Sequence, residues 1–274
     1  MKRIASLMSV AACMVAATAY LVAGSAAAQG SLPTITLTLT GKSITVGGTP
    51  VTGAVNVVST VSGEKQGEPT LVYLKPGVNL AQVFAAAAKD PNALDPYGAI
   101  VMDANVFKGT GTVQTVLSQP GTYLALDTIG NNPAKWPMAQ FTVAPSSAPA
   151  TLPPAQATIK TIEFGFRGAA TLHNGELVRF ENAGYLVHMV DWIGVRNAAG
   201  ARQLTALLLA GKDKQLMKVA TSFGQFMGPA SSGAVEQFVV HAKPGIYVLA
   251  CFMDTQDGRE HTQLGMERTI RIVK

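Results

Sequence analysis

The sequence predicts an all-β protein made of two tandem β-sandwich domains of Greek-key type, each with a short helical insertion. Short segments with alternating apolar and polar residues follow one another, and TITLTLTG at 34–41 is the clearest of them. Glycine and proline turns separate these segments. The second half of the chain then repeats the order of segments of the first half, which predicts two sandwiches rather than one.

Residues 1–28 are typical of a cleaved export signal. Lys2 and Arg3 precede an apolar stretch, and Ala26-Ala27-Ala28 fits a cleavage site before Gln29. The alternative is a membrane anchor, but the stretch is rich in Ala and Ser and ends in the cleavage pattern. We therefore expect a periplasmic or secreted protein with no stable membrane insertion after cleavage.

The first predicted domain covers residues 29–143 and carries no metal ligands. Its expected strands are 34–41, 43–46, 54–60, 70–74, 98–102, 112–118, 121–129 and 138–143. Between them, residues 79–89 have apolar side chains at helical spacing, and Asn79 is placed to cap that helix.

The second predicted domain covers residues 158–274 and follows a linker. Residues 144–157 (APSSAPATLPPAQA) are rich in Pro, Ala and Ser and carry no charge, which is typical of a semi-rigid linker. The expected strands of the second domain are 161–168, 176–182, 185–195, 235–242, 244–251 and 263–272, with a helical segment or a pair of short helices at 202–220.

Two pairs of segments align between the halves, and the aligned residues differ in their ability to bind a metal. PGTYLALD at 120–127 parallels PGIYVLAC at 244–251, so Asp127 stands where the second half has Cys251. KWPMAQFTV at 135–143 parallels QLGMERTIRI at 263–272, which places Met138 opposite Met266. All four histidines of the chain lie in the second half. A soft metal is therefore expected only there, with the first half as scaffold or docking surface.

Charge and cysteine content narrow the function classes. The net charge of +5 over 274 residues comes without a cluster of Lys and Arg, so binding to nucleic acid is not indicated. After signal cleavage one cysteine remains, which excludes an internal disulfide. A lone thiol in an oxidising compartment is a liability unless it is buried or bound, which favours a purpose for Cys251.

Four residues form the candidate site. Cys251 ends a strand, His261 lies in the loop after it, and Met266 opens the next strand. His188, on the apolar face of the expected strand 185–195, is the candidate second histidine. Thiolate, thioether and two imidazoles favour copper, with a weak axial methionine. Cys251 and the two histidines alone would also suit Zn²⁺, and the methionine favours copper.

In these motifs the second half resembles the cupredoxin family of blue copper proteins. The shared pattern is an F-x-N-x-G-like turn at 180–184, a strand histidine, PG-x-Y-x-x-x-C at 244–251, a loop histidine and a methionine. The resemblance implies one copper ion held by His188, Cys251, His261 and Met266, and one-electron transfer with an exported redox protein or contact with a copper-delivery partner.

The chain departs from the family in two places. Nine residues, 252–260, separate Cys251 from His261, where the familiar carriers have a short loop. Familiar members also often have Asn after the first histidine to tie the cysteine loop, and here Met189 stands there, so that support is missing or comes from elsewhere. His261 is expected to be the more exposed ligand and the electron exit.

The sequence also bears on three other functions. The same residues could serve a copper carrier or chaperone without fast redox cycling, or the fold could be a metal-free interaction module. An enzyme is not expected, because multicopper oxidases and copper nitrite reductases need more histidines, including His-x-His pairs in the oxidases, than this chain contains.

Overall fold

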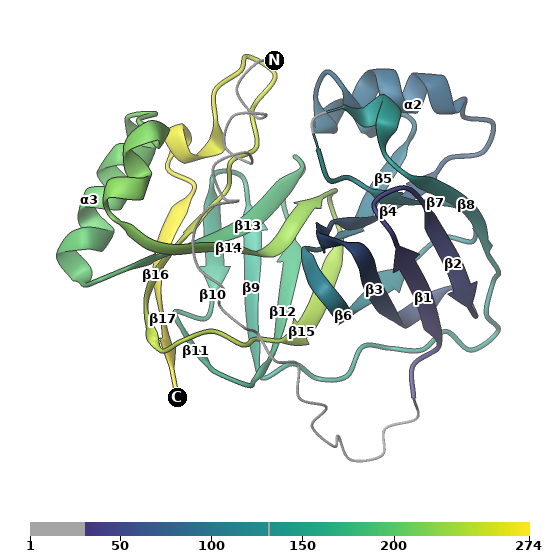
Figure 1. The fold of residues 1–274 in the computed structure, drawn as a ribbon, viewed down its shortest axis with the longest axis horizontal. Coiled ribbons are helices and arrows are strands. Elements are labelled where there is room, and N and C mark those ends of the chain that lie inside the picture. The colour runs from purple at the N-terminus through teal and green to yellow at the C-terminus, as the bar shows by residue number, and fades with distance from the viewer. Residues whose placement is uncertain (1–30, 131) are drawn as a thin grey trace.

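The computed structural model describes residues 31–130 and 132–274, which form two β-sandwiches side by side (Figure 1). The expected all-β fold is confirmed. The predicted export signal at 1–28 lies outside the described residues. No helix in the described ranges is long and apolar enough to cross a membrane.

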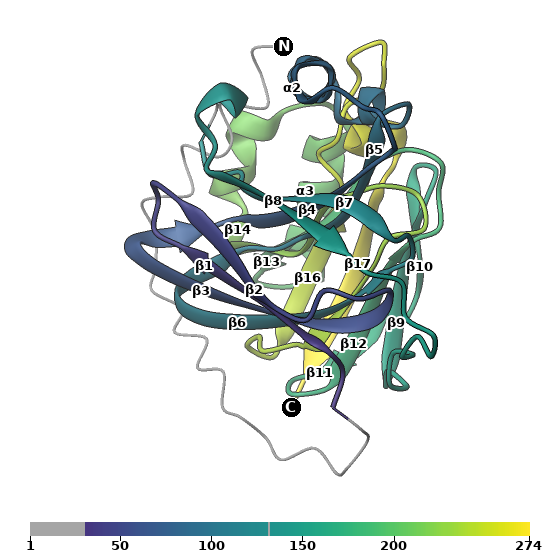
Figure 2. The same ribbon diagram turned by 90° about the vertical axis from the view of Figure 1, so that its right-hand side faces the viewer.

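Within the described residues, the first half contains eight strands in two layers (Figure 2). One layer is formed by β1 (Thr34–Leu39), β2 (Ile44–Gly48), β3 (Gly53–Gly67) and β6 (Val106–Leu117). The other layer has the order β5-β4-β7-β8, with β4 (Pro69–Leu74), β5 (Gly98–Asp103), β7 (Gly121–Asp127) and β8 (Met138–Val143).

The second half repeats this arrangement with nine strands. One layer holds β9 (Ala157–Ile162), β10 (Gly165–Gly168), β12 (Leu177–Asn182) and β15 (Val235–Val239). The other is a sheet of order β11-β17-β16-β13-β14, with β11 (Thr171–His173), β13 (His188–Val195), β14 (Ala220–Ala230), β16 (Gly245–Ala250) and β17 (Glu267–Val273).

Strand pairing agrees between the halves. β1 runs parallel to β3 as β9 does to β12, and β7 is antiparallel to β4 and β8 as β16 is to β13 and β17. The Tyr123 hydroxyl donates to the Gln119 carbonyl at 2.8 Å, and the Tyr247 hydroxyl donates to the Lys243 carbonyl at 2.6 Å. These equivalent corners hold the strand before each Asp127 or Cys251 position in the same way. A repeat within the sequence itself stays a prediction.

One sheet is shared by the two halves. Its order is β10-β9-β12-β15-β6-β3-β1-β2, so the equivalent strands β15 and β6 meet edge to edge. The antiparallel register pairs Glu236 with Thr115 and Gln237 with Gln114. The Gln237 side-chain amide also donates to the Gln114 side chain at 3.1 Å. This pairing covers two strand edges that would otherwise be exposed.

The segment expected to link the halves has no helix or strand between 145 and 156. Its carbonyls accept hydrogen bonds from both sides: Ala150 from the Ala54 amide, and Pro153 from the Arg179 and Gln237 side chains. The segment is therefore held along the joint between the halves. The predicted domain limits at 143 and 158 stay predictions.

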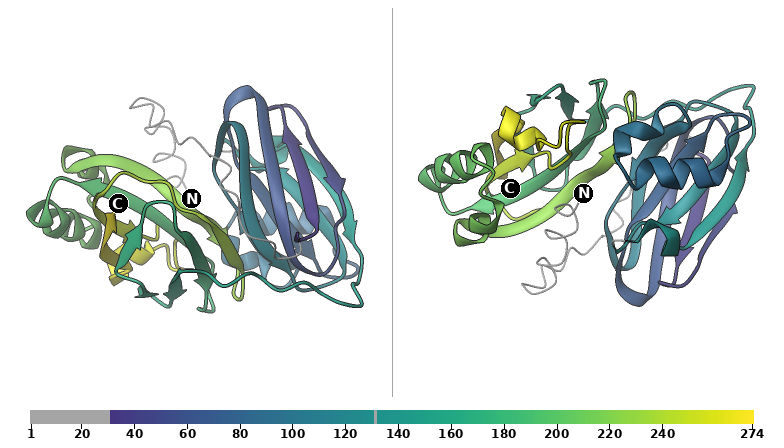
Figure 3. Two further views of the ribbon diagram at one scale, coloured as in Figure 1. Left: turned by 90° about the horizontal axis from the view of Figure 1, so that it is seen from below. Right: turned by 90° about the horizontal axis from the view of Figure 1, so that it is seen from above.

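Each half carries its expected helical insertion. Helix α2 (Leu80–Ala87) is capped by the Asn79 side chain and is followed by the 3₁₀ turn η2 (Pro91–Leu94). Helix α3 (Ala198–Leu209) begins before the predicted 202, because Asn197 caps the Gly200 amide, and η4 (Asp213–Lys218) follows it. Two further 3₁₀ turns are η3 (Pro133–Lys135) and η5 (His261–Leu264). Helix α3 lies at the outer end of the second half, away from α2 (Figure 3).

Two strand predictions need correction. The single strand expected at 161–168 is the hairpin β9–β10, which turns at Glu163 and Phe164, with Phe164 at a φ of 55°. Strand β14 was not anticipated, because its sequence ATSFGQFMGPA lacks regular alternation. Pairing with β13 forms it, with register shifts along that pairing.

Buried carboxyl groups gather where the halves meet. Asp103 of β5 and Glu236 of β15 are almost completely buried, and the Asp103 amide donates to Glu236 Oε1 at 2.9 Å. Burial raises the pKa of both groups, and of Asp191, well above the usual range. Burial also raises the pKa of Glu68 to about 7. The folded protein therefore holds protons that the unfolded chain releases.

This arrangement predicts a stability that falls as the pH rises. Between about pH 4.5 and 7 the unfolded chain loses carboxyl protons that the folded chain retains, so unfolding becomes more favourable across that window. In Glu236→Gln the amide oxygen still accepts from Asp103 and no charge is buried. We expect its melting temperature at pH 8 to rise by on the order of 3 °C, with a shallower fall between pH 5 and 8 in thermal scans.

The matched control is Glu181→Gln on the neighbouring strand β12, where the carboxylate is partly exposed and pairs with Lys160 at 2.7 Å. It should keep the wild-type slope, because the buried carboxyl groups remain. Identical slopes in Glu236→Gln and wild type would contradict the assignment of the pH dependence to this cluster.

Candidate metal site

The four predicted ligands sit at one end of three neighbouring strands. His188 is the first residue of β13, Cys251 directly follows β16, and Met266 directly precedes β17. Because β16 is antiparallel to both β13 and β17, its end lies beside their beginnings. His261 begins η5, which connects the loop after Cys251 to β17.

Three of the four residues place their ligand atoms within reach of one ion. His188 Nδ1 lies 3.2 Å from His261 Nδ1, and Cys251 Sγ lies 3.8 Å and 3.4 Å from these two nitrogens. The circle through three points with these separations has a radius of about 2.0 Å, close to the length of metal–imidazole and metal–thiolate bonds. The three atoms thus form a trigonal set around a point at bonding distance from each. Among the described residues, they are the group of His, Cys, Asp and Glu side chains found to converge in this way.

Both histidines have a buried ring nitrogen without a hydrogen-bond partner. These atoms are Nε2 of His188 and Nε2 of His261. The two Nδ1 atoms face each other, and the gap between them has room for one proton at most. The rings are therefore placed for a shared electrophile at Nδ1 rather than for hydrogen bonds of their own. Two imidazoles and a thiol in this geometry fit one copper ion in the second half.

Burial keeps all three groups neutral. His188, Cys251 and His261 have no exposed surface. Burial lowers the pKa of His188 to about 4, and burial together with the neighbouring His188 lowers the pKa of His261 to about 4. Burial raises the pKa of the Cys251 thiol to about 12. The expectation that His261 is the more exposed ligand is therefore wrong, because both imidazoles are fully buried.

Backbone pairing joins the two ends of the 252–260 loop. The His261 amide donates to the Met253 carbonyl at 2.8 Å, and Asp254 pairs with Glu260 across the loop. The tip is closed by its own bonds, including Thr255 N to the Arg259 carbonyl at 2.8 Å. The extra residues thus form a small hairpin beyond the site, and His261 returns to within hydrogen-bonding distance of the second residue after Cys251.

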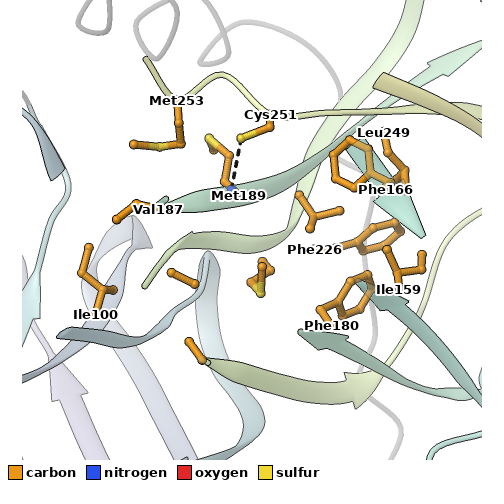
Figure 4. Packing of buried hydrophobic residues seen from close by; sticks show 14 of the residues in the cluster. Ile100, Ile159, Phe166, Phe180, Val187, Met189, Phe226, Leu249, Cys251 and Met253 are labelled. Carbon is orange, nitrogen blue, oxygen red and sulfur yellow. Dashed lines mark hydrogen bonds between the residues drawn. The ribbon is translucent and has the colours of Figure 1, made fainter. Parts of the chain in front are cut away.

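Backbone groups tie the cysteine end of the site to its neighbours. The Met189 amide donates to Cys251 Sγ at 3.3 Å, as the dashed line in Figure 4 shows. The Cys251 amide donates to the Met266 carbonyl at 3.3 Å, and the Met266 amide donates to the His261 carbonyl at 3.0 Å. Met266 is fully buried. Its thioether as fourth ligand stays a prediction.

A turn that the sequence did not point to covers both rings. Glu163 Oε1 lies 3.7 Å from His188 Nε2 and accepts from the amides of Tyr185 and Leu186. Partial burial acts to raise the pKa of Glu163, but these amide hydrogen bonds outweigh it and hold the pKa below its usual value. Phe164 packs edge-on against His261, with ring centroids 5.2 Å apart. The carboxylate is placed to orient His188 from outside the ligand set.

Gly184 explains the F-x-N-x-G-like turn in physical terms. A Cβ at this position would lie 2.8 Å from His188 Nε2, closer than side-chain contacts allow. Asn182, two residues earlier, accepts from the Gly184 amide at 2.9 Å and donates to the Leu186 carbonyl at 2.8 Å. The turn therefore lets His188 lie close to the backbone and fixes the chain on either side of it.

The remaining histidines lie outside this group. His173 and His241 are exposed, and His173 Nδ1 contacts the Lys274 carbonyl at 3.3 Å. In the first half, Asp127 occupies the Cys251 position and accepts from the Glu68 amide at 3.0 Å. Met138 is not the counterpart of Met266: Leu126 pairs with Met138 but Ala250 pairs with Glu267, so Pro137 takes that place.

Comparison with known proteins gives structural likenesses only. No family model matches the chain, and no curated protein matches it in sequence. Similar solved structures include auracyanin A, a "blue" copper protein from Chloroflexus aurantiacus, at 18% identity over 42% of this chain and 98% of that chain, with a TM-score of 0.24. Copper nitrite reductase from Nitrosomonas europaea is 12% identical over 88% of this chain and 94% of that chain, with a TM-score of 0.25.

One sequence-based expectation is corrected by this comparison. The chain was not expected to be an enzyme, yet the similar structures include a multicopper oxidase, two copper nitrite reductases and a laccase, which are enzymes. These structures cover 87–88% of this chain at 11–12% identity, with TM-scores of 0.24–0.25. The expectation of a non-enzymatic protein is withdrawn.

The neutral ligands predict how copper binding depends on pH. Binding must displace one proton from the Cys251 thiol, while the imidazoles are already neutral above about pH 5. The apparent affinity for Cu²⁺ should therefore rise about tenfold per pH unit between about pH 6 and 8. Competition with a chelator of known pH-dependent affinity measures this slope. An affinity independent of pH over that range would show that the thiolate is not a ligand.

Proposed function

We propose that the second half of the chain is a type 1 copper site that carries single electrons between exported redox proteins. Its ligands would be His188, Cys251 and His261 in a plane, with Met266 as a weak fourth ligand. The observation that carries the proposal is the separation of 3.2–3.8 Å among the three ligand atoms. Copper, when bound there, supplies the one-electron couple.

The residues of the chain supply a rigid, dry setting for that couple. His188 and Met266 adjoin strands of one sheet, and Cys251 and His261 are joined to them by backbone hydrogen bonds. Because the ligand atoms already lie at the corners of a trigonal site, little movement is needed when the charge on the ion changes. The low pKa of both imidazoles keeps them available as ligands at neutral pH.

The complete burial of the three ligands bears on the carrier alternative. A carrier must release its ion to a partner, which is easier when at least one ligand is exposed. Here His188, Cys251 and His261 have no exposed surface, and Phe164 and Glu163 lie against the two rings. Slow exchange and stable redox cycling are therefore favoured over delivery. The same proposal includes export to the periplasm or outside the cell. It also includes another exported redox protein as the partner.

Titration with Cu²⁺ tests the site directly. We expect an intense thiolate-to-copper absorption in the visible range that saturates at one equivalent and is absent in Cys251→Ala. His241→Ala is the matched control, because His241 is exposed and outside the cluster, and it should keep the full absorption. No visible band and no tight binding by the wild-type chain would overturn the copper site and favour a metal-free module.

Substitution of Met266 tests the fourth ligand and the redox role together. A thioether donates weakly to Cu²⁺, so Met266→Leu should keep the visible band and raise the reduction potential. The expected rise is at least about 60 mV, the shift that corresponds to a tenfold change in relative affinity for the two oxidation states. Protein-film voltammetry measures it, with Met253→Leu, a buried methionine near the site, as control. Equal shifts in both variants would argue against Met266 as ligand.

A further inference from the structure

A residue of the first half reaches the two segments that carry the metal ligands. Asn92 Oδ1, in η2, accepts a hydrogen bond from the Val187 amide at 2.6 Å. Its Nδ2 lies 3.4 Å from the Asp254 carbonyl, as donor. Val187 immediately precedes His188, and Asp254 belongs to the loop between Cys251 and His261. One side-chain amide thus bridges two segments that are far from it in sequence and come together only in the fold.

The position of Asn92 is fixed by its own turn. Asp90 caps η2, and its Oδ1 accepts from both the backbone amide and the side-chain Nδ2 of Asn92, each at 2.9 Å. Pro91 begins the turn and restricts its backbone. The side-chain amide is therefore oriented before it meets the second half, and its carbonyl oxygen is left to face Val187.

Apolar packing brings η2 to this place. Leu94 of η2 and Val83 of α2 belong to the same buried cluster as Cys251 and Met266. In Figures 1 and 2, α2 and the loop that follows β16 lie at the same end of the molecule. Ile100 of the first half and Val187 of the second both belong to this cluster and are drawn in Figure 4. The first half thus shares one continuous hydrophobic core with the strands that carry the site.

We propose that Asn92 is a positioning residue for the metal site, and that the first half serves the second by supplying it. The inference rests on the proposed copper function. It answers why Met189, at the position after the first histidine, carries no side-chain amide: the tie between the histidine strand and the cysteine loop comes from the other half of the chain. The Asn92–Val187 bond is the shorter of the two links and holds the start of β13, and with it His188.

The test combines a measurement without metal and one with it. In the apoprotein, Asn92→Ala should increase hydrogen exchange of the Val187 amide at least about tenfold, while the amides of β16 and β17 stay protected. In the copper-loaded protein, transfer of copper to a chelator should become about 10- to 100-fold faster, because loss of an outer partner usually lowers metal affinity by that factor and we expect the loss to act on release. Asn132→Ala is the matched control, because Asn132 caps η3 in the same way, through the Ala134 amide at 3.2 Å, and should change neither quantity.

A second variant distinguishes the hydrogen bond with Val187 from the one with Asp254. It also replaces Asn92→Ala as the test if that variant does not fold. Asn92→Asp keeps an oxygen acceptor for the Val187 amide but loses the donor toward both Asp254 and Asp90. We expect the Val187 amide to be better protected than in Asn92→Ala, and copper to be released at a rate between those of wild type and Asn92→Ala. Wild-type release in Asn92→Asp would overturn the bridging role.

The failure of this inference differs from a failure of the copper site. A wild-type chain that binds copper, together with an Asn92→Ala variant whose copper release and Val187 exchange are unchanged, overturns the role of Asn92 alone. A wild-type chain without the visible band overturns the copper function and this inference with it.

Discussion

The antiparallel pairing of β16 with its neighbours β13 and β17 is the constraint on which the site depends. Antiparallel strands bring the end of one beside the beginning of the next, so Cys251 meets His188 and Met266 without any special loop. His261 is then needed from a loop, and the hydrogen bond from its amide to Met253 returns it there. The extra length of the 252–260 loop lies beyond this bond and does not loosen the ligand triangle.

Burial gives this corner of the sheet its chemistry. It holds a thiol and two imidazoles in their neutral forms, with the Sγ atom and the two Nδ1 atoms facing one another. The surrounding residues support the same geometry from outside: the Met189 amide on Cys251, Glu163 beside His188, Phe164 against His261 and Asn92 behind Val187. The site is therefore a property of both halves, although its candidate ligands come from one.

The two halves share their strand pairing but differ in the residues at the position of the candidate site. They pair their strands in the same order and join through the equivalent strands β6 and β15. The position of Cys251 is filled in the first half by Asp127, which bonds to Glu68 and belongs to a region of buried carboxyl groups. A one-residue difference in register places Pro137 rather than Met138 opposite Met266. Equivalent positions thus hold a candidate soft ligand set in one half and hydrogen-bonded carboxyl groups in the other.

Sequence alone determined the all-β class, most strands, the α2 cap at Asn79 and the types and order of the four candidate ligands, because alternation, capping and residue chemistry are local properties. The hairpin at Glu163 and Phe164, strand β14, the shared sheet and the burial of His261 were decided by tertiary structure. Asn92 and Glu163 could not be found in advance, since nothing local marks them; each acquires its role only when a distant segment packs against it. The chemistry of a side chain determines what it can bind. The packing of strands far apart in the chain determines which side chains come together.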